Sequence, residues 1–158
     1  MGLNGQAPTA TDNSSLSTNL KLRVPEEARI LIVCDHDSVT ARLKTVLQEV
    51  RIISETARSI TAGCELAKSG QFQVVVCQPS LSDGSWARLV DVAHHFGLGF
   101  EVVLLASTFD LMQWAEALRD GAFDVLDSLY DLPRAAETLK RAVWAAYLKG
   151  RCAAPQRG

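Results

Sequence analysis

Side chains that could bind a metal ion or move a proton follow the first apolar run of the chain, ILIV. They are Cys34, Asp35, His36 and Asp37, in consecutive positions. A thiol, an imidazole and two carboxylates could serve a metal site or a nucleophilic reaction. The same residues also suit a small buried cysteine followed by a polar turn, which is the commoner pattern. We therefore expect Cys34 to be a buried thiol, and leave open whether its oxidation modulates binding.

A second apolar run, VVVC, leads directly into Gln78. Its β-branched residues, closed by Pro79 and an Asp-Gly turn, predict a central strand of a parallel sheet covered on both faces. In open α/β sheets, ligands bind at the carboxyl ends of such strands, so an active group is expected at Gln78. A glutamine amide is poorly suited to chemistry, so its presence at this position argues against a reaction there.

Two further candidates have simpler explanations. His94 and His95 are adjacent on an expected helix, where successive side chains point about 100° apart and cannot act on one ligand. Asp83 stands in the Asp-Gly sequence, where forming a turn is a sufficient role. We expect neither the histidine pair nor Asp83 to carry a reaction.

Five apolar runs alternate with five helical patterns, which predicts an α/β domain with a doubly wound, five-stranded parallel sheet. The second strand, around Ile52–Thr56, is weaker and is expected at the sheet edge. The buried stripe of the fourth helix is expected at Leu111, Trp114, Ala115 and Leu118. Trp86 is likewise expected to face the core. Ser38 is expected among the turn and N-cap residues before the first helix.

The 158 residues are about one domain in length. We expect a disordered tail over residues 1–27, a folded domain over 28–149 and a short tail over 150–158. Within the first tail, Leu20–Val24 is the part that could pack on the body. The last helix is expected to open at Pro133, a residue common in first turns.

Composition excludes several function classes. The net charge is −2 and no face collects Lys and Arg, so direct nucleic-acid binding is not expected. No apolar run approaches membrane-spanning length, and the first residues do not resemble a secretory signal. The four cysteines lack metal-type CxxC spacing. We therefore expect a cytoplasmic protein with reduced thiols.

The segments ILIVCDHD, VVVCQPSLSDG, VVLLAS and RDGAFDVLDSLYDL occur in the order of the landmarks of one family. Over roughly Arg29–Leu148 the sequence resembles a response-regulator receiver domain of the CheY type. The resemblance implies a flavodoxin-like (βα)5 fold with strand order 2-1-3-4-5. It also implies a role in two-component, phosphorelay-type signal transduction.

The functional groups of a receiver can be compared with this sequence position by position. The two adjacent acids that bind magnesium fall on Cys34 and Asp35. The phosphoacceptor aspartate falls on Gln78, the hydroxyl residue that ends the fourth strand on Ala106, and the lysine that ends the fifth strand on Ser128. Of these groups only Asp35 remains, so the resemblance implies a degenerate pocket.

The chemistry of these residues agrees with that comparison. An amide cannot attack phosphorus to form an acyl phosphate. Magnesium prefers several hard oxygen ligands, and Asp35 alone predicts weak binding at best. We therefore expect a pseudo-receiver that is not phosphorylated, is not an enzyme, uses no cofactor and acts by protein–protein interaction.

Receivers use the surface of the fourth helix, fifth strand and fifth helix for dimerisation and partner docking. The resemblance implies a homodimer or a protein partner of a two-component pathway on the same surface here. On the last helix, Glu137, Arg141 and Trp144 share a face apart from the buried stripe, and an exposed Trp beside Arg is typical of an interface centre. With Arg119 on the preceding helix, they are the expected interaction surface.

Two alternatives stay open. One is a conventional phosphorylated regulator with a displaced acceptor, which would need another carboxylate at the pocket. The other is a phosphatase, because Asp35-His36-Asp37 resembles the first motif of the haloacid-dehalogenase type, with Asp35 as nucleophile and Asp37 as acid–base. Ser107 would then match the second motif, but no lysine lies between Ser107 and Lys140 to serve as the third.

Overall fold

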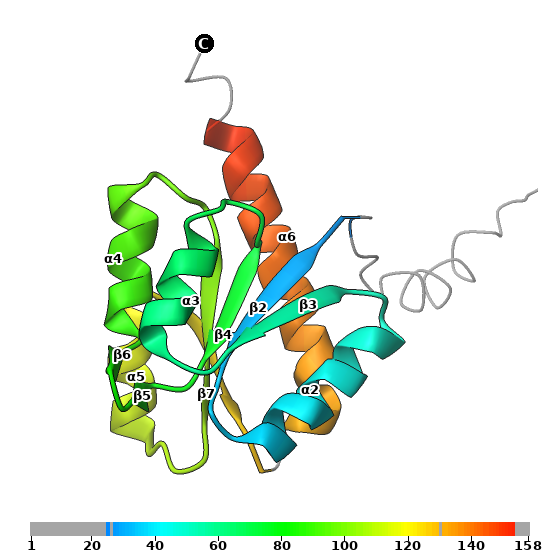
Figure 1. The fold of residues 1–158 in the computed structure, drawn as a ribbon, viewed down its shortest axis with the longest axis vertical. Coiled ribbons are helices and arrows are strands. Elements are labelled where there is room, and N and C mark those ends of the chain that lie inside the picture. The colour runs from blue at the N-terminus through cyan, green and yellow to red at the C-terminus, as the bar shows by residue number, and fades with distance from the viewer. Residues whose placement is uncertain (1–24, 26, 130, 154–158) are drawn as a thin grey trace, which may run out of the picture.

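The computed structural model describes residues 25, 27–129 and 131–153 of the chain. Apart from Pro25 and Glu27, the expected tail over residues 1–27 lies outside this part, and so does Leu20–Val24. Residues 154–158 also lie outside it. The fold that follows is shown in Figure 1.

Five parallel strands form the central sheet. They are β2 (Arg29–Val33), β3 (Ile53–Ala57), β4 (Val74–Cys77), β7 (Glu101–Ala106) and β8 (Ala122–Asp127). Their order in the sheet is β3-β2-β4-β7-β8, and every neighbouring pair is parallel. This confirms the predicted α/β class, the 2-1-3-4-5 order and the place of the second strand at the edge. Two short strands after β4, β5 (Ser80–Leu81) and β6 (Gly84–Ser85), form an antiparallel hairpin that the sequence did not predict.

Helices cover both faces of the sheet (Figure 1). They are α2 (Asp37–Glu49), α3 (Ile60–Ala67), α4 (Ala87–His95), α5 (Leu111–Arg119) and α6 (Ala135–Ala153), the last preceded by a 3-10 turn, η1 (Leu132–Arg134). Residues of α2 and α6 pack on one face, and residues of α3 and α4 pack on the other. The structure is therefore three-layered, as the alternation of strands and helices predicts.

The apolar runs divide between the two faces with a period of two. In β2, Ile30 and Ile32 belong to the core under α2 and α6, whereas Leu31 and Val33 belong to the core under α3 and α4. All four are completely buried. A strand covered on both faces has no solvent side, which explains why ILIV and VVVC are uninterrupted apolar runs.

The expectation for the fourth helix was wrong. In α5, Leu111 is 75% exposed and both Trp114 and Leu118 are 41% exposed, while Ala117 is the buried residue. The helix contacts β8, an edge strand, and reaches the core through this one small side chain. Its apolar stripe is real but lies on the surface of the domain, so the rule that such a stripe faces the core fails here.

Three smaller expectations also need correction. The first helix begins at Asp37 with His36 as its N-cap residue, so Ser38 lies inside it. Trp144 is half-buried rather than exposed, with its ring edge-on to Tyr147 at 5.4 Å between centroids. Helix α6 continues to Ala153, through the first residues of the expected tail. Trp86 does pack against the core under α3 and α4, as expected.

Candidate functional site

The carboxyl ends of four strands surround one hollow. Because parallel strands in register end at the same edge of the sheet, the residues that follow them come together. Cys34, Gln78, Ala106 and Ser128 all line a cavity of about 440 Å³, which we call the strand-end pocket. Asp35, the other residue assigned to this site from the sequence, lies beside the pocket and is not among its lining residues.

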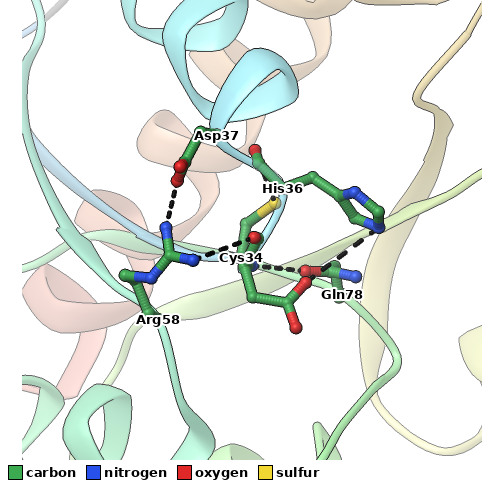
Figure 2. A network of polar contacts seen from close by, with 6 residues as sticks. Cys34, His36, Asp37, Arg58 and Gln78 are labelled. Carbon is green, nitrogen blue, oxygen red and sulfur yellow. Dashed lines mark hydrogen bonds and ion pairs between the residues drawn. The ribbon is translucent and has the colours of Figure 1, made fainter.

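Gln78 is bonded into the neighbouring loop. The backbone N–H of Asp35 donates to Gln78 Oε1 at 2.6 Å, and the backbone N–H of Gln78 donates to the carbonyl oxygen of Val33 at 3.0 Å. Figure 2 shows this connection between the end of β4 and the loop after β2. The carbonyl oxygen of the amide is therefore engaged within the protein, while its NH₂ group makes no hydrogen bond to the described residues.

Arg58 holds the same loop from its other side. Its guanidinium forms an ion pair with Asp37 and donates from Nη2 to the backbone oxygen of Asp35 at 3.3 Å (Figure 2). Both side chains of the ion pair are largely exposed, so the pair contributes little to stability. Its main effect is to hold the Arg58 side chain against the loop after β2. Asp37 thus faces Arg58 and is not among the residues of the pocket wall, whereas the phosphatase alternative would use it beside Asp35.

Cys34, Cys64 and Cys77 are free cysteines. Cys34 is buried, with Sγ 3.7 Å from the backbone oxygen of His36, as the sequence predicts for a buried thiol. Burial raises the pKa of the Cys77 thiol far above its usual range, because the charged thiolate is poorly solvated there. Cys77 is therefore a protonated core residue and not a nucleophile.

Asp83 does more than form a turn. Its carboxylate accepts hydrogen bonds from the backbone N–H groups of Thr61 and Ile60, each at 2.8 Å, at the first turn of α3. Ser59 caps the same helix by accepting from the N–H of Ala62 at 3.1 Å. The bonds from Thr61 and Ile60 lower the pKa of Asp83 to about 2. Asp83 thus ties the β5–β6 hairpin to α3.

Asp83→Ala is expected to lower Tm by several degrees, because α3 loses two of its capping bonds. The folded pKa of about 2 lies below the ordinary value of about 3.9, so the ionised carboxylate stabilises the fold above about pH 4. This contribution disappears as the pH falls towards 2. Thermal unfolding from pH 7 to pH 2 should show a Tm gap that closes only below about pH 4. Asp91→Ala, on the exposed face of α4, is the matched control, and an equal gap for both variants would contradict this assignment.

A second hollow of about 600 Å³ lies between α5, β8 and α6. Phe109, Leu111, Trp114 and Val125 give it an apolar wall, and its rim is charged. We call it the α5–β8–α6 groove. The charged lining residues are Asp110, Asp124, Asp127, Asp131, Arg134, Glu137 and Arg141.

The expected interaction surface is only partly assembled. Glu137 and Arg141 line the groove together. Arg119 lies elsewhere, in a separate hollow near the start of β7 that also contains Glu101 and Lys149. Trp144 is not among the groove residues either. Of the four residues expected on one surface, the structure therefore brings Glu137 and Arg141 together and places Arg119 and Trp144 outside the groove that they line.

Several residues of the site were not singled out from the sequence. They are Arg58, Ser80 and Thr108, of which the last two line the strand-end pocket. Arg58 and Thr108 come one or two residues after a strand, which is the signal that identified Gln78 and could have identified them. Among the described residues, no three His, Cys, Asp or Glu side chains form a group that could hold a metal ion. None of the described helices is long and apolar enough to cross a membrane.

Comparisons by sequence gave no match, either to protein-family models or to curated proteins. Comparison with solved structures gave many. The signal receiver domain of an HD domain-containing protein from Pseudomonas fluorescens Pf-5 has a TM-score of 0.70 and 21% identity, covering 81% of this chain and 95% of that one. The beryllofluoride-activated NtrC4 receiver domain, a dimer, has a TM-score of 0.67 and 23% identity, covering 75% and 98%.

A third similar structure is a complex from Saccharomyces cerevisiae, in which the receiver domain of Ssk1 is bound to the histidine phosphotransfer protein Ypd1. Its TM-score is 0.62 with 20% identity, covering 75% of this chain and 94% of that one. Identities of this size establish the fold and not the activity. The chain has the fold of response-regulator receiver domains.

Proposed function

We propose that this chain is a receiver-type signalling domain of a two-component pathway that acts through protein contacts and is not phosphorylated. The observation that carries the proposal is the state of Gln78 at the end of β4. An amide stands where the fold places its reactive group, and its oxygen accepts a hydrogen bond from Asp35 N–H at 2.6 Å. The structural similarity to receiver domains supports the more general part of this proposal, that the chain is a receiver-type signalling domain.

The neighbouring groups support the absence of phosphoryl transfer. An amide cannot form the acyl phosphate on which receiver signalling depends. Ser128 brings no positive charge to the pocket, so the wall offers nothing like a lysine to offset a phosphoryl group. Ala106 offers no hydroxyl to bind such a group. The displaced-acceptor alternative would need a carboxylate in the wall, and the described residues of the wall include none.

The same residues do not fit the magnesium ion that phosphorylated receivers use. Magnesium needs hard oxygen ligands in octahedral geometry, and its protein sites usually include one or two carboxylates. Here the described wall of the pocket includes no carboxylate, Cys34 is a buried thiol and the oxygen of Gln78 already accepts a hydrogen bond. We propose that magnesium binding is weak or absent and that no cofactor is needed.

The α5–β8–α6 groove is the proposed contact surface. Its wall exposes Leu111 and Trp114, and exposed apolar groups with a charged rim are typical of interaction sites. The rim carries both signs, with Arg134 and Arg141 among five acidic side chains. A two-fold interface requires such self-complementarity, so we propose a second copy as the occupant. A partner protein of a two-component pathway, as in the Ssk1 complex, is the alternative. Unpaired cysteines suit a cytoplasmic location.

Incubation with acetyl phosphate and magnesium tests the proposal. Intact mass spectrometry is expected to show no phosphoryl adduct on the wild-type protein, while a receiver that keeps its aspartate gains one. Gln78→Asp is the informative variant. It is also expected to remain unmodified, because Ala106 and Ser128 still lack the groups that would bind the phosphoryl oxygens.

A phosphoryl adduct on the wild-type chain would overturn the proposal and favour the displaced acceptor. Peptide mapping would then locate the modified carboxylate, with Asp35, Asp37 and Asp83 as the first candidates. An adduct on Gln78→Asp alone would keep the proposal for the natural chain. It would also show that the remaining pocket still supports transfer.

A further inference from the structure

A groove crosses the amino ends of neighbouring strands, at the end of the sheet opposite to the strand-end pocket. It consists of two hollows, of about 640 Å³ and about 340 Å³. The first borders the starts of β2 and β3, and the second borders the residue before β7. We call the two hollows together the amino-end groove. Both contain Gly70, Gln73 and Tyr147, with Pro25 and Ile53 at one end of the groove and Phe100 at the other.

Two large apolar side chains of this groove are exposed. Ile53 is 48% exposed at the start of β3, and Tyr147 is 40% exposed on α6. Phe72 and Phe100, which line the same groove, are each 5% exposed and belong to the core under α3 and α4. The groove therefore joins exposed apolar surface to the border of the core, and a segment that covers it would bury apolar area.

The loops of the groove leave room for another stretch of chain. A Cβ atom at Gly99 would meet nothing within 4 Å, and one at Gly70 would meet only Cδ2 of Leu98, at 3.7 Å. Both glycines line the groove. Backbone without side chains allows a second chain to approach closely. The space between Ile53 and Phe100 is therefore open at its floor.

The chain enters the described domain in this groove. Residues 1–24 lie outside the described part, and Pro25, the first residue of that part, lines the groove. The carbonyl oxygen of Pro25 accepts from the N–H of Ala28 at 3.1 Å, which closes a turn directly before β2. A turn reverses the chain, so the residues before Pro25 approach from the side of the domain and not along the axis of β2.

The five residues before Pro25 have a composition that suits packing on a surface. Leu20, Leu22 and Val24 alternate with Lys21 and Arg23. In an extended chain this alternation places the three apolar side chains on one side and the two basic side chains on the other. Residues 1–19 contain no Lys, Arg or His, so the pattern is confined to the residues next to the groove.

The length and the charge of this segment both fit the groove. Neighbouring strands lie about 4.8 Å apart, so the amino ends of β3, β2, β4 and β7 span about 14 Å. Five extended residues span up to about 17 Å. Glu27 is an exposed acid of the groove, and its neighbour Arg29 is already paired with Glu55 at 3.5 Å. The acidic side chain that remains complements Lys21 and Arg23.

We propose that Leu20–Val24 docks in the amino-end groove of its own domain, with its apolar side chains on Ile53 and Tyr147 and its basic side chains at the rim. The contact joins the start of the chain to the end of α6, the helix that also borders the α5–β8–α6 groove. A tethered segment needs only weak affinity, because its effective concentration is about millimolar. The folded domain then begins at Leu20 and not at residue 28. This inference is independent of the proposed function.

Methyl NOE spectra of the full chain test the proposal. Contacts are expected between the methyl groups of Leu20, Leu22 or Val24 and the ring of Tyr147. A sample that mixes isotope-labelled with unlabelled chains separates contacts within one chain from contacts between chains. Contacts within one chain support the proposal. Contacts found only between chains would overturn it and assign the groove to the same segment of a second copy.

Leu22→Asp is the informative variant. It is expected to raise the equilibrium constant of unfolding by about fivefold, because a docked leucine loses its apolar contacts. It should also shift the amide signals of Ile53 and Gln73. Leu16→Asp makes the same change outside the docking segment and should do neither. Equal effects of the two substitutions, or no effect of Leu22→Asp, would overturn the inference.

A double-mutant cycle locates the contact. In a Tyr147→Ala background, Leu22→Asp is expected to raise the unfolding constant by less than about twofold, because its partner is gone. Leu148→Ala is the matched control, since Leu148 follows Tyr147 on α6, is 54% exposed and does not line the groove. In that background the effect of Leu22→Asp should stay at about fivefold. The same effect in both backgrounds would place the segment elsewhere and overturn the inference.

Discussion

Gly63→Ala is expected to lower the free energy of unfolding by about 1–3 kcal/mol, although alanine is the better residue in most helices. A Cβ atom at Gly63 would lie 2.7 Å from Cγ2 and 3.2 Å from Cγ1 of Val33. Val33 is completely buried in β2, and its β-branched side chain has little rotameric freedom. The missing side chain of Gly63 is therefore what lets α3 approach the sheet.

Gly150→Ala provides the matched control for this prediction. Gly150 also lies in a helix, α6, but a Cβ there meets nothing within 4 Å. The free energy of unfolding of this variant is expected to rise by about 0.5–1 kcal/mol. Chemical denaturation of both variants and of Gly63→Ala/Val33→Ala measures the effect. The double variant should lose less free energy of unfolding than the two single variants lose together, because trimming Val33 relieves the contact. Equal stabilisation by the two glycine substitutions would show that α3 does not pack as described.

Leu111→Glu is expected to weaken self-association by more than about tenfold while leaving Tm nearly unchanged. Leu111 lines the α5–β8–α6 groove and is 75% exposed, so its replacement disturbs the proposed interface and not the core. A carboxylate there would also add to a rim that is already rich in acids. Sedimentation velocity over a range of protein concentrations measures the dimer affinity.

Leu148→Glu is the control for the interface prediction. Leu148 is 54% exposed on α6 but does not line the groove. It should leave self-association unchanged. The same loss of affinity for both variants would mean that the dimer uses another face, and a wild-type chain that stays monomeric at every concentration would exclude a second copy as the occupant. Binding of a histidine phosphotransfer protein that Leu111→Glu abolishes would then favour the heterologous partner.

The sheet could be predicted from the sequence because its central strands are buried on both faces and therefore need apolar residues at every position. Runs such as ILIV and VVVC are apolar at every position, and only a strand buried on both faces uses such a run fully. The strand ends followed from the same runs, and with them Gln78, whereas the resemblance to receiver domains added Cys34, Ala106 and Ser128. All four residues line the strand-end pocket. A local sequence pattern is therefore enough to predict a strand that is completely buried.

The rest depended on contacts between distant segments. An apolar stripe such as Leu111, Trp114 and Leu118 has the same period whether it faces a core or a partner, so the sequence could not place α5. Asp83 caps a helix that begins 23 residues earlier, and Arg58 pairs with Asp37, which lies 21 residues before it at the start of α2. No local pattern contains such pairings. Trp144 was expected to be exposed, but it is half-buried, with its ring edge-on to that of Tyr147 one turn along α6.

Both ends of the described chain leave the domain at the end of the sheet opposite to the strand-end pocket. Pro25 and Tyr147 line one hollow beside the start of β2, and Lys149 pairs with Glu101, the first residue of β7, at 3.0 Å. In Figure 1 the end of α6 extends past the sheet on this side. Attachment to a sensor chip, a resin or a fluorescent fusion through either end therefore leaves the pocket and the groove facing free solution. Immobilised protein is thus a suitable reagent for measuring the binding of partner proteins.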